Sequence, residues 1–304
     1  MYQAYQNSSQ HRLSVHNSLI MDALNSTKPD DHQISWLLEL FIAYEEDSNV
    51  KLVIVKGKGR AFCAGGDVAA VIRDINEGEY LGLAGARLDG AEMLVCGLAT
   101  HFVPSERLSL LEEALCKVDS SDPAIISAVI NEYSKQPYMK EKSAYHRLKV
   151  IDRCFSRRTV EEIISVLERE ALNKKDDWIS ETIQTLKRAS PTSLKISLRS
   201  ERTELNAQIN QIRQGRLQGV GQCLVREYRI ACHVMQGKLS RDHFEGSRAI
   251  LLDKDKNPKW EPSKLELVSD DMVDSYFSMM DDEGWEDLKL PARSNLPAYA
   301  IAKL

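Results

Sequence analysis

The chain has 304 residues, of which 43% are hydrophobic and 28% charged, proportions typical of a folded globular protein. Its formal net charge of −5 argues against a general nucleic-acid binder, which needs a basic face. Apolar runs such as LVIV at 52–55 and AILL at 249–252 are short, whereas a membrane span needs roughly 20 apolar residues in a row.

The first predicted elements form a piece of α/β architecture. Apolar residues at helical spacing predict a helix over 34–44. The run 50–56 is rich in β-branched residues and predicts a buried strand, which ends at the glycines that follow. A second helix is predicted at 68–74, after a Gly-Gly turn. Residues 33–75 therefore predict the order helix, strand, glycine turn, helix.

From Asp89 onward the pattern is mainly helical, with one short strand expected at 99–103. Asp89 is interpreted as a helix cap, and the sequence Thr159 to Glu162 predicts a capping box. Further helices are expected at 91–96, 106–117, from 123, 163–167, 176–188, 191–198, 224–235, 244–249 and after Ser269.

The most informative motif is RAFCAGGD at 60–67, between the predicted strand and the following helix. Adjacent glycines allow a tight turn and leave backbone N–H groups unshielded by a Cβ atom. At a helix N-terminus such groups point toward partial negative charge, so a carbonyl oxygen that becomes an oxyanion is a suitable guest. The alternative is a plain tight turn in which Asp67 caps its helix.

The segment KLVIVKG at 51–57, together with this motif, closely resembles the oxyanion-hole segment of the crotonase (enoyl-CoA hydratase/isomerase) superfamily. The letters AFCAGGDV resemble its 3-hydroxyisobutyryl-CoA hydrolase branch, and the resemblance covers most of residues 36–290. Further stretches that look like this branch are LAGARLDG at 83–90, GLATHFV at 97–103, SPTSLK at 190–195, CLVREYR at 223–229 and 244–260.

The resemblance implies an α/β fold, a truncated crotonase-like ββα spiral followed by a mainly helical C-terminal region. It divides the chain into a variable N-terminal tail (1–32), an incomplete crotonase-like core (33–110) and a helical region (111–304) that ends in a targeting tail. The implied reaction is hydrolysis of the thioester 3-hydroxyisobutyryl-CoA in valine breakdown. No cofactor is expected, because coenzyme A is part of the substrate.

The resemblance also assigns roles to individual residues. The backbone N–H of Gly66 falls where the family has its first oxyanion donor, with Gly65 and Ala64 beside the substrate. Lys56 and Arg60 are candidates to meet the phosphates of coenzyme A, and a solvated turn is the alternative interpretation.

Several motifs of the family have no counterpart in this chain. The family's second glycine-rich turn, GGGxG, is missing, because Gly65-Gly66 is the one Gly-Gly pair. Its PET and FPDVG stretches, which carry the acid/base carboxylates, are missing too. Only the six residues 75–80 separate the predicted helix 68–74 from Leu81, where the family has a long stretch. Glu79 stands at this deletion point as a candidate catalytic carboxylate, and a solvated loop acid is the alternative.

Three functions follow as hypotheses: a working thioester hydrolase, a non-catalytic acyl-CoA binder or defective product, and an enoyl-CoA hydratase-like protein. The last residues, Ala302, Lys303 and Leu304, resemble a peroxisomal address that an import receptor binds. The chain is therefore expected in the peroxisome, with a homo-oligomer left open. Bound metal and disulfides are not expected, since the six cysteines are scattered. Nucleic acid is not expected as a partner because of the negative net charge. His101 is interpreted as a buried, hydrogen-bonded histidine.

Overall fold

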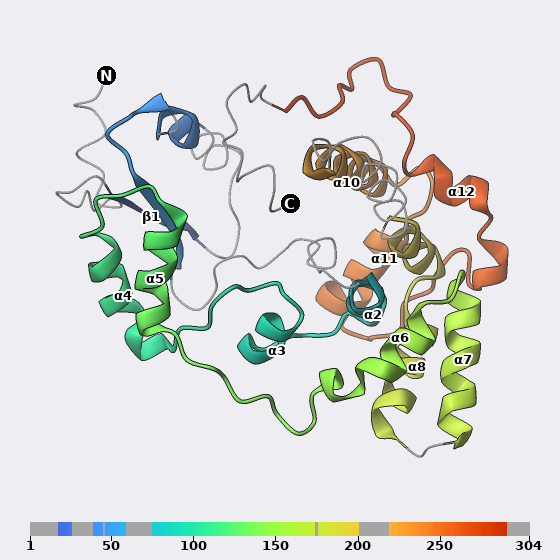
Figure 1. The fold of residues 1–304 in the computed structure, drawn as a ribbon. Helices are drawn as coiled ribbons and strands as arrows, with labels where there is room; N and C mark the ends of the chain where they lie inside the picture. Colours follow the sequence, from blue (N-terminus) through green and yellow to red (C-terminus); the bar gives the residue numbers. More distant parts are fainter. Residues whose placement is uncertain are drawn as a thin grey trace, which may run out of the picture. The chain divides into compact units, whose positions relative to one another are not determined.

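The structure is a computed structural model that describes residues 18–25, 39–44, 46–58, 75–173, 176–200 and 219–290. The chain divides into two compact units that alternate along the sequence (Figure 1). The first takes Met1–Asp67 and Leu88–Lys140, and the second takes Val68–Arg87 and Glu141–Leu304. The predicted division into tail, core and helical region follows the segments of the family, whereas these two units are defined by contacts within the structure. That division therefore stays a prediction.

The first unit contains a parallel pair of strands, β1 (Ser18–Asn25) and β2 (Leu52–Lys58), in which Ile20 lies opposite Ile54. The helical residues 39–44 lie between them in sequence, as a parallel pair requires a crossover. Strand β2 confirms the strand predicted at 50–56. Strand β1 was not predicted and lies inside the segment expected to be a tail.

Short helices are the other elements among the described residues of the first unit. Asp122 caps α5 by accepting a hydrogen bond from the Ala124 N–H at 2.8 Å, with Pro123 in the first turn, a position suited to proline. The elements are α3 (Gly90–Val95), η3 (Ser105–Arg107), α4 (Leu108–Leu115) and α5 (Pro123–Tyr133).

The strand predicted at 99–103 is wrong. These residues carry no strand ladder and include a bend at Thr100. Their backbone bonds join the Ala99 N–H to the Met93 carbonyl at 3.0 Å and the Lys135 N–H to the Phe102 carbonyl at 2.9 Å. Apolar residues in an extended segment become a strand only where a neighbouring strand satisfies their backbone groups.

The second unit is helical in the part of the chain that the structure describes. Its elements are α2 (Ile75–Ala84), η4 (Ala144–Arg147), α6 (Leu148–Phe155), α7 (Val160–Asn173), α8 (Asp177–Arg188), helical residues 191–200, α10 (Gly219–Gln236), α11 (Asp242–Ser247), the π-helix η5 (Arg248–Leu252), η6 (Leu265–Leu267) and α12 (Asp270–Ser275). The mainly helical character expected for this region is confirmed.

Local caps explain where several of these helices begin. The Thr159 hydroxyl accepts a hydrogen bond from the Glu162 N–H at 3.2 Å, and the Glu162 carboxylate accepts one from the Arg158 N–H at 2.9 Å. Asp176 caps α8 and Ser269 caps α12 in the same manner. Each satisfies N–H groups that the first turn leaves without a partner, so these predicted starts are confirmed.

The core of the second unit joins α2, α6, α7 and α8 (Figure 1). Its fully buried side chains come from successive apolar positions of α6, α7 and α8, because one face of each helix is apolar. They are Ile151, Cys154, Phe155, Val160, Ile163, Leu167, Ile179 and Leu186. No helix of the described ranges is both long and apolar enough to cross a bilayer.

Candidate functional site

The predicted oxyanion turn falls between β2, which ends at Lys58, and α2, which begins at Ile75. The structure therefore describes the strand that leads into the turn, whereas the helix predicted at 68–74 lies outside the described residues. The residues predicted in the turn itself lie outside the described residues: Arg60, Ala64, Gly65 and Gly66.

Lys56 on β2 is half-buried and forms an ion pair inside the first unit. Its Nζ lies 2.7 Å from Oε2 of Glu112 on α4, and the two side chains are 39% and 28% exposed. A pair this exposed contributes about 0–1 kcal/mol. The phosphate-binding role predicted for Lys56 stays a prediction, and in this structure a carboxylate already neutralises the ammonium group.

Glu79 lies in the middle of α2 and is 2% exposed. The interpretation as a solvated loop acid is therefore wrong, because the residue is neither in a loop nor in contact with bulk solvent. A carboxylate that is taken out of water needs polar partners or a specific task. The catalytic role of Glu79 stays a prediction.

Aromatic packing fixes the helix that carries Glu79. The ring of Tyr80 meets Phe155 of α6 edge-on, with centroids 5.3 Å apart, and lies 5.5 Å from Trp178 of α8. The Trp178 Nε1–H donates a hydrogen bond to the Tyr80 hydroxyl at 3.0 Å. Such pairs add to the area that they bury, so the start of the second unit is rigidly held at α2.

The interpretation of Asp89 as a helix cap is confirmed. Its carboxylate accepts hydrogen bonds from the Ala91 and Glu92 N–H groups at 3.0 and 3.1 Å, and the Asp89 N–H donates one to the Glu92 carboxylate at 2.8 Å. The bond from the Glu92 N–H, together with the neighbouring Lys140 ammonium, holds the pKa of Asp89 below its usual value. An ionised cap is what a helix N-terminus favours.

His101 is hydrogen-bonded, as expected, but half-buried rather than buried. Its Nδ1 lies 2.9 Å from the Thr100 hydroxyl and its Nε2 lies 3.4 Å from the Ser127 hydroxyl. Both contacts are to hydroxyl groups of the same unit, which is the pattern of a structural histidine.

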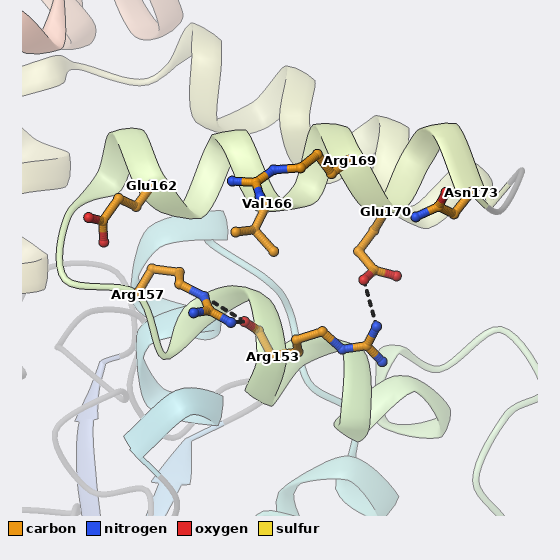
Figure 2. A pocket seen from close by; sticks show the side chains of 7 residues that line it. All are labelled: Arg153, Arg157, Glu162, Val166, Arg169, Glu170 and Asn173. Atoms are coloured by element: carbon orange, nitrogen blue, oxygen red, sulfur yellow. Dashed lines mark hydrogen bonds and ion pairs between the residues drawn. The ribbon is translucent and has the colours of Figure 1, made fainter.

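The described residues contain no group of three or more His, Cys, Asp or Glu side chains that could hold a metal ion. A cavity between α6 and α7 is lined by arginines and glutamates that the sequence analysis did not single out (Figure 2). Charged residues on an exposed helix face form no recognisable motif, so only the packing of two helices could reveal that cavity.

A family profile described as Enoyl-CoA hydratase/isomerase matches this chain in two pieces, residues 22–79 and 74–277. The chain belongs to the enoyl-CoA hydratase/isomerase family. The two matched ranges overlap at residues 74–79. The stretch of the family with no counterpart in this chain was predicted at the same place.

Relatives of known name support the narrower resemblance. The chain is 50% identical to 3-hydroxyisobutyryl-CoA hydrolase 1 of Arabidopsis thaliana over 356 residues, a match that covers 90% of this chain and 91% of that one. It is also 44% identical to the small ribosomal subunit protein mS47 of the same plant, over 73% of this chain and 52% of that protein. The hydrolase match spans 52 positions more than the 304 residues of this chain, so at least that many positions have no residue here.

The fold is confirmed by likeness to a solved structure. A carnitinyl-CoA dehydratase from Mycobacterium thermoresistibile superposes with a TM-score of 0.69 over 90% of this chain and 98% of that chain, at 21% identity. At this identity the likeness shows the fold alone. The chain thus has a crotonase-like fold that lacks an internal segment and continues into a mainly helical region.

Proposed function

We propose that this chain hydrolyses an acyl-CoA thioester, with 3-hydroxyisobutyryl-CoA as the substrate. The observation that carries the proposal is the 50% identity, over 90% of the chain, with a 3-hydroxyisobutyryl-CoA hydrolase. The hydrolase-like letters continue on both sides of 74–79, from the oxyanion motif to the region around Trp260.

In the proposed reaction, water adds to the thioester carbonyl, the C–S bond breaks, and coenzyme A leaves as a thiol that takes up a proton. The N–H of Gly66 donates a hydrogen bond to the carbonyl oxygen as it gains charge, and one such donor is worth roughly 3–4 kcal/mol in the transition state. Glu79 is the candidate carboxylate that activates the water. Since its side chain is 2% exposed, it acts only on a water inside the protein.

The experiment measures thiol release from 3-hydroxyisobutyryl-CoA by the purified full chain, with Gly66→Pro, Glu79→Gln and Glu283→Gln as variants. Gly66→Pro removes the N–H donor and is expected to lower kcat/KM at least about 100-fold. Glu79→Gln is expected to abolish turnover, whereas Glu283→Gln, an exposed acid of the second unit, leaves it unchanged. Absence of thiol release from the unmodified chain contradicts the proposal.

A second candidate function is acyl-CoA binding without turnover. The hydrolase match has 52 or more positions with no residue in this chain, and the motifs that the resemblance expects to carry the second oxyanion donor and the acid/base carboxylates have no counterpart in the sequence. The likeness to a protein named as a ribosomal subunit shows that sequences of this kind also carry names other than hydrolase. Saturable binding of 3-hydroxyisobutyryl-CoA with no thiol release would favour this candidate.

A hydratase remains the third alternative, and no specific observation favours it, because the solved structures show the fold alone. It is tested in the same preparation by following water addition to an enoyl-CoA, which consumes the conjugated double bond.

The cellular setting is also a proposal. We propose a peroxisomal role in valine catabolism, with the import receptor binding Ala302, Lys303 and Leu304, which resemble a peroxisomal address. A fluorescent protein fused before residue 1 tests the address: Leu304→Asp should move the fusion out of peroxisomes. Size-exclusion chromatography with light scattering tests the homo-oligomer that the sequence leaves open.

A further inference from the structure

A cavity of about 510 Å³ lies between α6 and α7 of the second unit, apart from the residues of the proposed hydrolase site. In Figure 2, Arg153 and Arg157 reach it from α6 and the turn after α6, while Val166 and Arg169 come from α7. Cavities of this size hold small-molecule ligands.

The charges around the cavity are unequal. Three arginines and two glutamates line it, which gives the lining a net charge of +1 in a chain whose formal net charge is −5. Arg153 and Glu170 form an ion pair at 2.6 Å, so their charges cancel, whereas Glu162 keeps its charge and accepts a hydrogen bond from the Arg158 backbone N–H at 2.9 Å. The net positive charge of the lining favours an anionic ligand.

The guanidinium groups of Arg157 and Arg169 differ in how firmly they are held. Arg157 donates from Nε and Nη2 to the Arg153 carbonyl at 3.1 and 3.0 Å, which fixes its plane over the end of α6. Arg169 makes longer contacts, 3.4 and 3.5 Å, with the carbonyl and hydroxyl of Ser165. Bonds near 3.5 Å are weak, so an anion replaces them at little cost.

We infer that this cavity binds a small molecule that carries a compact oxyanion, phosphate or carboxylate, beside an apolar portion. Guanidinium groups match the geometry of both oxyanions, and Arg157 and Arg169 supply the donors. The apolar portion lies on Val166. The Arg153–Glu170 ion pair joins α6 to α7 beside the cavity (Figure 2), which favours a small molecule over a long peptide. The inference does not depend on the proposed thioester chemistry.

The test is calorimetric titration of the full chain with inorganic phosphate and, separately, with citrate, at constant ionic strength set by chloride. We expect saturable binding of at least one of them, weakened at least tenfold in the double variant Arg157→Gln/Arg169→Gln. Arg188→Gln is the matched control, because it removes an exposed arginine at the end of α8, and its binding should equal that of the unmodified chain. Which anion binds identifies the oxyanion.

The single variant Arg169→Gln covers the case in which loss of Arg157, which contacts the end of α6, unfolds the protein. It should weaken binding about threefold or more, and Arg169→Lys should fall between the two, since lysine keeps the charge without the planar fork. Absence of saturable binding by both anions overturns the inference. So does equal binding by the unmodified chain and the Arg169→Gln variant.

Discussion

Lys195 joins three segments of the second unit through one ammonium group. Its Nζ lies 2.9 Å from Oε1 of Glu161 on α7 and donates a hydrogen bond to the Val268 carbonyl at 3.0 Å. Burial is the largest single influence and raises the pKa of Glu161. The hydrogen bond and charge of Lys195, together with hydrogen bonds from the Glu161 backbone and the Thr159 side chain, outweigh it, so this pKa lies below its usual 4.5. The ionised pair therefore stabilises the fold.

Glu161→Gln is expected to lower the free energy of unfolding at pH 7 by about 1 kcal/mol. Because the folded-state pKa is depressed, the stabilisation is present above about pH 4.5 and is lost as the pH falls through the lower folded-state value. Urea unfolding at pH 7 and pH 3 checks this: the gap between the original chain and the variant should shrink at pH 3. An equal gap at both values would mean that the charge contributes nothing.

Cys154 offers a second residue-scale prediction. Burial raises the pKa of its thiol to about 11, and the residue is 0% exposed, so almost no thiolate forms at pH 8. An alkylating thiol reagent at pH 8 should label the half-buried Cys116 and Cys232 before Cys154, which should react only after unfolding. Peptide mass mapping of the timed reaction measures the order. Early labelling of Cys154 contradicts the burial.

Single residues also show what the sequence can and cannot reveal. The cap at Asp89 and the helix starts at Asp176 and after Ser269 were predicted because a cap and the N–H groups that it meets lie within three positions of each other. The partner of Lys56 could not be predicted, because Glu112 is 56 positions away and their meeting depends on how α4 packs beside β2. Hydrogen bonds between neighbouring residues can be predicted from short sequence patterns, whereas ion pairs between distant residues depend on how the chain folds.

At the scale of elements, α2 determines how the second unit begins. Its residues Tyr80, Leu81 and Leu83 are all buried, and it packs on α6 and α8. No helix was predicted for this stretch, which was interpreted as a deletion point because a long stretch of the family is absent there. Glycines at 78 and 82 also weaken a helical pattern. Tertiary packing overrides that weak local preference, and this is why a candidate loop acid is found in a buried helix.

Phe155→Ala should show how much this packing is worth. The side chain is 0% exposed and its ring meets Tyr80, so we expect the free energy of unfolding to fall by about 3–5 kcal/mol. Leu172→Ala on α7 is the control, because Leu172 is 87% exposed and should change stability by less than about 0.5 kcal/mol. Urea unfolding followed by tryptophan fluorescence compares them. Similar losses in the two variants would contradict this packing.

Strands show the limit of prediction from sequence at this scale. The run 50–56 was identified because it is β-branched and ends at glycine, and it became β2. The run 99–103 has a similar composition but no neighbouring strand ladder, and β1 was missed although Leu19, Ile20 and Met21 form a short apolar run. A strand is a property of a pair, so composition alone identifies only a candidate.

For the whole molecule, one comparison indicates where the chain departs from its family, and a second indicates that positions are missing. The family profile matches in two pieces that meet at 74–79, and the hydrolase match spans more positions than this chain contains. The sequence alone had indicated the same place, because the family's second glycine-rich turn and its Pro-Glu dipeptide can be searched for directly and are absent. What the sequence could not give is how the remaining parts pack, since α2 gained its buried position from α6 and α8.

This departure predicts that restoring the missing segment will restore catalytic power. A chimaera that carries, between Asp74 and Glu79, the segment of 3-hydroxyisobutyryl-CoA hydrolase 1 with no counterpart here should release thiol with kcat/KM raised about 100-fold or more. The reason is that a second oxyanion donor alone is worth roughly 10²–10³ in rate, before any gain from added carboxylates. Gly66→Pro in the chimaera should remove most of this gain if both donors act on the same oxygen. A folded chimaera no faster than the original chain would show that the missing positions do not hold the rest of the site.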